Sequence, residues 1–363
     1  MQNGKLRAEI VRVDQLDPRQ RQYWRGFLRD NRALGSPYFT LEFAELMSRA
    51  RPDTRVLAIT RNGTPVGFLP LHLSRTGIIR PLGGPLSDHH GLVTDDPWLN
   101  LKDVISAARL GVFLFDGAIA SQLGFAAHAH AMQPSWVVNM ADGFDAYWEE
   151  RRQSEAKAMR NIRSRDRKLQ AASSQIIYRV DDRRVEALDK LLSIKRHQYQ
   201  ATRAMDVFKG KWARTLIYSL MMHRTDELSG VLSTLEVDGQ LAAAHFGMRS
   251  SNVLHYWFPV YDPGYAQFGP GLLLFREMAR ELSETGITRF DLGPGDYDFK
   301  HRLSNDAFAI ASGQICAFSA SALAVMAGHR LDRFAQSLPL GRASHWPGKA
   351  MRRIDAMVAV HAI

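Results

Sequence analysis

The sequence is poor in cysteine, because its 363 residues include only one, Cys316. This excludes an internal disulfide framework and any zinc or iron–sulfur site built from several thiolates. The sequence also lacks a run of 18 uncharged apolar residues, and its most apolar stretch, residues 317–328, is too short to cross a bilayer. The first residues contain no apolar core typical of a signal peptide. We therefore expect a cytoplasmic protein, with contact to the inner membrane surface as an open alternative.

The composition is that of a globular protein with an excess of positive charge. Apolar residues make up 45% of the chain and charged residues 23%, which excludes a disordered, collagen-like or coiled-coil chain. Lysine and arginine number 47 against 37 aspartates and glutamates, a formal net charge of +10. This excess suits an anionic partner such as a nucleotide cofactor, a polyanion, a lipid surface or a nucleic acid, without choosing among them.

The order of the predicted elements repeats once along the chain. In the first half, a helical pattern over residues 40–50 precedes a hairpin whose turn is Asn62-Gly63. In the second half, a helical pattern over 211–222 precedes a hairpin whose turn is Asp238-Gly239. Asx-Gly between two apolar strands is a strong hairpin signal. The repeat predicts two similar α/β domains; the alternative is a chance recurrence of a common unit.

We predict four segments from this repeat and from the charge pattern. They are an N-terminal domain (1–145), a basic connecting helix (146–175), a C-terminal domain (176–315) and a basic helical tail (316–363). The connecting helix holds eight basic residues between 151 and 168. It is interpreted either as a solvated helix or as a contact for phosphates or another polyanion. We expect the tail to pack on the body of the protein, with membrane-surface docking as the alternative.

The most informative stretch runs from residue 253 to 302 and reads strand, glycine turn, helix, strand. The turn is Gln267-Phe-Gly-Pro-Gly271, and Gly286 fits the end of the helix. A glycine turn that leads into a helix gathers free N–H groups at the positive end of the helix dipole, which suits a pyrophosphate. No Gly-Lys-Ser/Thr follows, so the turn is not a Walker loop. The alternative is the ordinary turn of a βαβ unit.

Two parts of this stretch resemble the CelD/BcsL-type acetyltransferases, a branch of the GNAT superfamily related to the Fem peptidyltransferases. They are Tyr261-Asp-Pro-Gly-Tyr-Ala-Gln-Phe-Gly-Pro-Gly-Leu-Leu-Leu and Arg289-Phe-Asp-Leu-Gly-Pro-Gly-Asp-Tyr-Asp-Phe-Lys-His-Arg. The resemblance covers about residues 150–305 and is looser over 20–140. It implies an α/β (α+β) fold of two tandem GNAT-like domains, each a mixed, mostly antiparallel sheet flanked by helices.

The resemblance also implies an activity and a co-substrate. It implies transfer of an acyl group, such as acetyl, from acetyl-CoA or another acyl-CoA to an amine or hydroxyl of a sugar or polysaccharide precursor, in cellulose or exopolysaccharide biosynthesis. GNAT enzymes hold the CoA pyrophosphate at a Gln/Arg-x-x-Gly-x-Gly/Ala turn, and this chain offers a version that is one residue shorter. The cofactor-binding residues expected from it are Gln267, Phe268, Gly269, Gly271 and Leu272.

Acyl transfer needs a base for the acceptor and a proton for the departing thiolate. Three residues are the catalytic candidates. His245 lies on a predicted strand among small residues, and Asp291 and Asp296 flank Gly293-Pro-Gly295 at the end of another strand. Each has a structural alternative: a hydrogen-bonded strand histidine, and loop carboxylates that cap nearby N–H groups.

Five further residues are predicted to bind substrates. The tyrosines are expected to line an acceptor groove, and the cations to neutralise CoA phosphates or developing charge; core packing and surface charge are the alternatives. They are Tyr256, Tyr261, Tyr297, Lys300 and Arg302. No metal site is expected, because Asp88-His-His90 and His128-Ala-His130 lack the spacing of metal ligands.

Two other functions compete with the acyl-CoA-dependent transferase. One is a Fem-like aminoacyl-tRNA-dependent transferase, in which the basic helix contacts tRNA. The other is a degenerate, non-catalytic GNAT pair that serves as a scaffold in a polysaccharide synthase complex at the membrane. DNA is not an expected partner.

Overall fold

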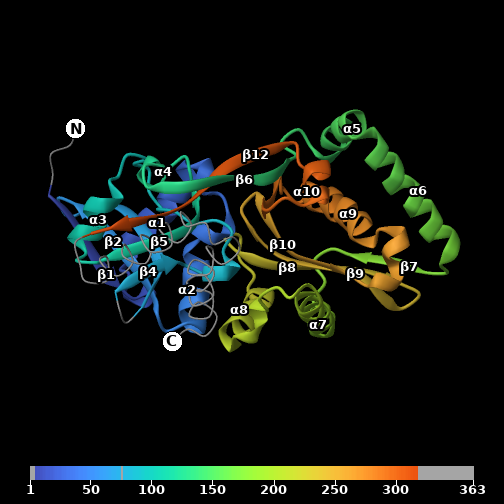
Figure 1. The fold of residues 1–363 in the computed structure, drawn as a ribbon, viewed down its shortest axis with the longest axis horizontal. Coiled ribbons are helices and arrows are strands. Elements are labelled where there is room, and N and C mark those ends of the chain that lie inside the picture. Colours follow the sequence, from blue (N-terminus) through green and yellow to red (C-terminus); the bar gives the residue numbers. More distant parts are fainter. Residues whose placement is uncertain (1–4, 75–76, 318–363) are drawn as a thin grey trace, which may run out of the picture.

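The computed structural model describes residues 5–74 and 77–317, and these form one continuous sheet of twelve strands with helices on its faces (Figure 1). The predicted tail beyond residue 317 lies outside the described residues. The first half of the chain contains β1 (Leu6–Val11), α1 (Pro18–Asp30), α2 (Leu41–Ala50), β2 (Thr54–Arg61), β3 (Thr64–Leu73), β4 (Ile78–Pro81), α3 (Leu101–Ala107), β5 (Val112–Ile119), α4 (Leu123–Ala126) and β6 (Ala129–Asn139).

The second half contains α5 (Phe144–Ser154), α6 (Ala156–Ala172), β7 (Ile176–Arg179), α7 (Val185–Thr202), α8 (Lys211–Met222), β8 (Ser229–Val237), β9 (Gln240–Ser250), β10 (Val253–Tyr261), α9 (Pro270–Glu284), β11 (Arg289–Pro294), α10 (Asp298–Leu303) and β12 (Asp306–Cys316). Short 3-10 helices connect several of these elements, among them η3 (Pro37–Phe39), η4 (Gly84–Leu86) and η6 (Pro263–Phe268). No helix among the described residues is both long and apolar enough to span a bilayer.

The two halves repeat the same strand pattern, which confirms the predicted fold class. In the first half β1 to β4 are antiparallel neighbours and β4 runs parallel to β5. In the second half β7 to β10 are antiparallel neighbours and β10 runs parallel to β11. Both predicted hairpin turns have two consecutive residues at positive φ, Asn62-Gly63 and Asp238-Gly239, the conformation that tight hairpins favour.

The halves exchange their last strands. The sheet order is β1-β2-β3-β4-β5-β12-β6-β11-β10-β9-β8-β7. Strand β6, from the first half, therefore lies beside β11, while β12, from the second half, lies beside β5. The two exchanged strands also pair with each other in the middle of the sheet. The predicted domain boundary at residues 145/146 separates the two halves along the sequence. In space, however, β6 and β12 each lie beside a strand of the other half.

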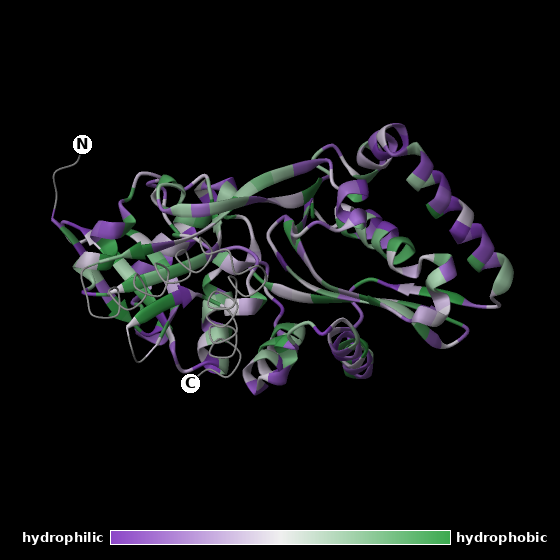
Figure 2. Cartoon of the chain, viewed as in Figure 1, coloured by the Kyte–Doolittle hydropathy of each residue, from purple (hydrophilic) through white to green (hydrophobic). Residues whose placement is uncertain are grey.

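The predicted basic helix, residues 146–175, is two helices in the structure, because the helix breaks at Glu155 between α5 and α6. Helix α6 lies at the edge of the second half, beside α9 (Figure 1). Its apolar face is narrow, with Met159, Ile162 and Leu169 buried, and hydrophilic residues cover most of its length in Figure 2. A salt bridge of 2.8 Å between Asp166 and Arg276 of α9 fixes its position. The helix thus brings arginines close to the N-terminal end of α9.

Strands β10 and β11 part after a short parallel contact. They pair at three positions only, from Val253↔Arg289 to His255↔Asp291. Each strand then has an irregular register with its other neighbour: β10 against β9 after His255, and β11 against β6 after Asp291. Such bulges bend a strand away from its partner. The sheet therefore opens between β10 and β11, just beyond His255 and Asp291.

Candidate functional site

A cavity of about 570 Å³ lies where β10 and β11 part. Its size falls within the range of small-molecule sites in proteins. The walls come from β10, the turn before α9, α9 itself, the end of β11 and α10. Four polar side chains are contributed from elsewhere: Arg165 of α6, Lys195 and Gln198 of α7, and Asp88 from the loop after η4 in the first half.

The predicted glycine turn forms one end of this cavity. Gly269 has a φ of +59° and precedes α9, and Gly269, Gly271 and Leu272 all line the cavity. The N–H groups of Leu272 and Leu273 donate to the Gly269 carbonyl. Pro270 has no N–H, so Gly271 supplies the one first-turn N–H of α9 without a partner among the described residues. No atom lies within 4 Å of the position a Cβ would take at Gly271, so the cavity is open there.

The other two residues predicted to bind the cofactor are placed differently. Gln267 is exposed, and Phe268 packs partly buried against the core beneath α9. Neither lines the cavity. Their assignment to cofactor binding stays a prediction.

Three cations border the cavity. Arg165 leans over the glycine turn, with its Nη1 only 2.6 Å from where a Cβ at residue 269 would lie, and it has no ion-pair partner among residues 5–74 and 77–317. Lys195 donates to the Pro259 carbonyl at 3.3 Å, and burial lowers its pKa. Lys300 donates to the carbonyls of Gly293 and Pro294, and burial lowers its pKa to about 8. The cavity therefore favours an anionic ligand.

Asp88 is the acidic group of the cavity, and two glycines allow it to reach this point. A Cβ at Gly293 would lie 2.5 Å from Asp88 Oδ2, and a Cβ at Gly117 would lie 2.5 Å from the Asp88 carbonyl oxygen. The carboxylate is 3.1 Å from Nε2 of His255 on β10. Burial would raise the pKa of Asp88, but His255, His89 and Lys300 together hold it below its ordinary value. Asp88 is therefore an ionised carboxylate at neutral pH.

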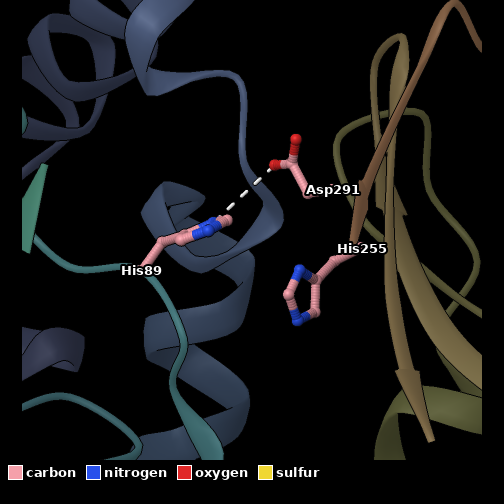
Figure 3. Close-up of side chains that lie close together, drawn as sticks. All are labelled: His89, His255 and Asp291. Carbon is pink, nitrogen blue, oxygen red and sulfur yellow. Dashed lines mark ion pairs between the residues drawn. The ribbon is translucent and has the colours of Figure 1, made fainter. Parts of the chain in front are cut away.

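His89, His255 and Asp291 form a buried cluster between the two halves (Figure 3). Its member His255 is in contact with Asp88. One nitrogen or oxygen of each cluster member lies within 4.8 Å of the others. However, the nitrogens of His89 are 3.0 Å from Ser36 Oγ and 2.8 Å from Ser135 Oγ, and Asp291 pairs with Arg289 at 2.9 Å. Because two of the three side chains already have partners within their own half, and His89 and Asp291 lie 3.7 Å apart across the halves, we interpret the cluster as a polar contact between the halves rather than as a cation site.

The predicted catalytic residues do not line this cavity. His245 is fully buried, stacks on Tyr256 with ring centroids 4.1 Å apart, and accepts a hydrogen bond from Trp257 N–H. Burial holds its pKa well below the ordinary value. Asp291 is fully buried beside Arg289, while Asp296 is 93% exposed and pairs with His301. A direct role in catalysis for any of them stays a prediction.

Most of the residues predicted to bind substrates lie on the cavity. Tyr256 is a buried part of its wall, whereas Tyr261 and Tyr297 are 44% and 60% exposed at its rim. Lys300 also lines the cavity, with its Nζ 5.4 Å from the centre of the Tyr297 ring. Arg302 instead pairs with Asp298 of the same helix, at the surface.

Asp88, Arg165 and Lys195 were not identified as site residues from the sequence. Asp88 and Arg165 come from segments distant from the motif in sequence, and only the exchanged sheet and the packing of α6 on α9 bring them to it. The sequence did contain one indication of a contact at this place. Glycine at a strand end, as in Gly293-Pro-Gly295, often marks a point where another group approaches the backbone closely.

Comparison with known proteins agrees with this geometry. Residues 156–301 match the family model of the acetyltransferase (GNAT) domain. The structure is similar to that of FemX, with a TM-score of 0.55 and 11% identity, over 84% of this chain and 98% of FemX. It is also similar to a tandem GNAT protein from the clavulanic acid biosynthesis pathway, with a TM-score of 0.51 and 11% identity, over 87% of this chain and 100% of that one. No curated protein matches the sequence.

The matched segment begins with α6 and ends within α10, so it contains the glycine turn, the parting strands and Lys300. Asp88 lies outside it, in the first half. Residues 156–301 are thus similar to a GNAT acetyltransferase domain, and the fold of the chain as a whole resembles that of a tandem GNAT protein.

Proposed function

We propose that the protein transfers an acyl group from acyl-CoA to an amine or hydroxyl acceptor. The observation that carries the proposal is the cavity between the parting strands β10 and β11, which ends at the N-terminus of α9. The apolar part of the cavity, lined by Tyr256, Leu272 and Phe275, suits the chain of a thioester, and the turn at its end suits the phosphates of the carrier. The GNAT-domain match over these residues supports the same chemistry.

In this proposal the glycine turn and Arg165 hold the pyrophosphate. The free N–H of Gly271 lies in the first turn of α9, at the positive end of the helix dipole, which attracts anions. The guanidinium of Arg165 lies against Gly269 and has five donors for phosphate oxygens. The turn has Ala266 where the GNAT pattern places glutamine or arginine, and we propose that Arg165 takes over that role from α6.

The transfer step needs a base and a proton donor, and the cavity offers one candidate for each. The acceptor attacks the thioester carbonyl and gives its proton to the Asp88 carboxylate, while the C–S bond breaks and the thiolate leaves. Lys300 uses two of its N–H groups on backbone carbonyls, so a third remains to stabilise the developing charge or to protonate the thiolate.

We propose a sugar or polysaccharide precursor as the acceptor. The support is the resemblance to the CelD/BcsL-type enzymes, together with the exposed rings of Tyr261 and Tyr297 at the rim of the cavity. Aromatic rings with one apolar face and one polar edge suit a sugar, which presents the same combination.

The test is release of free thiol from acetyl-CoA and longer acyl-CoAs in the presence of amino sugars, sugar nucleotides and oligosaccharides. Acceptor-dependent release, together with an acylated product by mass spectrometry, is expected from the wild type. The Gly271→Trp variant should lose it, because the indole would fill the open space at the turn. Glu284→Trp, at the exposed far end of the same helix, is the matched control. Absence of acceptor-dependent release with every acyl-CoA would contradict the proposal.

A second candidate function is transfer from an aminoacyl-tRNA. It is favoured by the cations of α6 that have no ion-pair partner among the described residues, Lys157, Arg160, Arg163, Arg167 and Lys168, and by the similarity of the fold to FemX. Binding of tRNA that weakens steeply as salt rises, and that is lost when these cations are replaced by glutamine, would support this function.

A further inference from the structure

His255 is a buried polar residue of the sheet, and the proposed reaction as described so far gives it no role. It lies on β10 at the point where the strands part, and its side chain is fully buried. Neither ring nitrogen makes a well-aligned hydrogen bond among the described residues. A buried polar group without a partner destabilises the folded state, so its presence in the core needs a reason.

The groups that face His255 come from four neighbouring elements, and all but one already have partners. His89 contacts Ser36 and Ser135, and Asp291 pairs with Arg289. His245 on β9 accepts from Trp257 N–H, and Tyr38 of η3, whose ring meets that of His255 edge-on at 4.9 Å, donates to the Leu86 carbonyl. The exception is Asp88, whose Oδ2 is 3.1 Å from His255 Nε2.

We infer that His255 is the positioning residue for Asp88, holding the carboxylate ionised and aimed into the cavity. An ionised carboxylate can only accept hydrogen bonds, so Nε2 must carry the proton and donate it. On its other side the same oxygen lies against the backbone of Gly293, where a Cβ would leave no space for it. Asp88 is thus held between a donor on β10 and the bare backbone of β11. This inference rests on the proposed function, in which Asp88 is the base.

Nε2 of His255 and Oδ2 of Asp88 are 3.1 Å apart, although the pair does not meet the angular criteria of a hydrogen bond. Catalytic hydrogen bonds are often long or misaligned in the free enzyme and tighten when the substrate binds.

The kinetic test compares two replacements of a buried histidine by phenylalanine. His255→Phe keeps a ring against Tyr38 but removes the donor, whereas His90→Phe, the control, changes a buried histidine that packs on Phe113 and Phe125 in the first half. We expect His255→Phe to lower kcat about 10- to 100-fold with the KM for acyl-CoA unchanged, since misplacement of a catalytic group by about 1 Å can cost 10²-fold. His255→Gln, which keeps an N–H donor, should recover part of the rate.

The acidic limb of the pH–rate profile separates positioning from a loss of packing. Removing His255 removes a cause that lowers the pKa of Asp88, so the limb should move to higher pH in His255→Phe and stay in place in His90→Phe. Equal kcat values for His255→Phe and wild type, or equal losses in the two variants, would overturn the inference.

A measurement without turnover keeps the inference apart from the proposed function. In ¹³C NMR titrations of the aspartate carboxylates, with the Asp88 signal identified from its loss in Asp88→Asn, the pKa of Asp88 should be higher in His255→Phe than in wild type. An unchanged pKa overturns the positioning role even if acyl transfer is found. A raised pKa in a protein that transfers no acyl group would keep the contact and reject the proposed function instead.

Discussion

Asp88 reaches the cavity of the other half because two glycines leave room for it. A side chain at Gly117 would collide with its backbone, and a side chain at Gly293 would collide with its carboxylate. Both glycines have positive φ, +76° and +74°, a conformation that residues with a Cβ rarely adopt. The contact is therefore built into the backbone on both sides, which is the reason to assign Asp88 a role beyond surface charge.

Replacement of Asp88 by asparagine tests this role at the residue scale. The amide has the same shape but cannot take up a proton, so we expect kcat to fall by about 10²–10⁴-fold, the usual contribution of a general base. Binding of acetyl-CoA and the melting temperature should change little. Steady-state kinetics and calorimetry check this, with the exposed Asp95→Asn as the control. A wild-type kcat in Asp88→Asn would show that another group is the base.

The lowered pKa of Lys300 leads to a second prediction, about the alkaline side of the pH–rate profile. Burial lowers its pKa to about 8, so the side chain is a cation below that pH and neutral above it. If the cation stabilises negative charge in the transfer step, kcat/KM should fall as pH rises through about 8. Lys300→Arg, which keeps its charge, should lack this fall in a pH–rate profile. Persistence of the same alkaline limb in the variant would assign it to another group.

At the scale of helices and strands, local patterns in the sequence were enough to predict the repeated elements. Asn62-Gly63 and Asp238-Gly239 fixed two hairpins, and the apolar spacing after Gly271 fixed α9. These elements depend on contacts between residues near in sequence. The exchange of β6 and β12 does not, since β12 pairs with a strand almost two hundred residues earlier, as in Ser312 Oγ–Asp116. No local pattern records such a choice of partner.

The part of the candidate site that lies close together in sequence was likewise predictable, and the part contributed by distant segments was not. The two glycines of the turn, Gly269 and Gly271, lie in one continuous stretch with Tyr256, Tyr261, Tyr297 and Lys300, and all of these line the cavity. The catalytic candidates His245, Asp291 and Asp296 lie on or next to strands β9 and β11, and none of them lines the cavity. The place where the cavity opens depends on the bulges after His255 and Asp291, and the alternation of apolar residues in the sequence does not reveal these bulges.

Helix α6 leads to a prediction at the element scale, because it carries Arg165 to the turn before α9. We expect Arg165→Ala to weaken binding of acetyl-CoA about tenfold or more while leaving acetyl-pantetheine, which lacks the pyrophosphate, unaffected. Arg163→Ala, on the exposed face of the same helix, should leave both unchanged. Inhibition constants or calorimetric titrations provide the comparison. An equal loss for both donors would mean that Arg165 does not act on the phosphates.

At the scale of the whole molecule, the exchanged strands make the two halves depend on each other. Each half needs a strand of the other to continue its sheet, β12 beside β5 and β6 beside β11. The pairs His89–Asp291, at 3.7 Å, and His255–Asp88, at 3.1 Å, also join the two halves. The proposed site, with its base from one half and its donor site in the other, exists only when both are folded.

The chain should therefore unfold in one cooperative transition, in spite of its two similar halves. Scanning calorimetry is expected to give one peak, with calorimetric and van't Hoff enthalpies that agree. A fragment of residues 1–140 should be insoluble or aggregated on its own, since without β12 the edge of β5 is left open for pairing. Two separate transitions, or a folded monomeric fragment, would show that the halves are independent.

Direct binding of acetyl-CoA tests the central claim, that the opening between β10 and β11 is a donor site. In isothermal titrations we predict one molecule bound per chain for the wild type and for Glu284→Trp, and binding at least tenfold weaker for Gly271→Trp. The bound ligand should also raise the melting temperature, since at 100 times Kd it adds about 2.7 kcal/mol to the stability of the folded state. No binding of any acyl-CoA to the wild type, or equal binding by Gly271→Trp, would contradict the account.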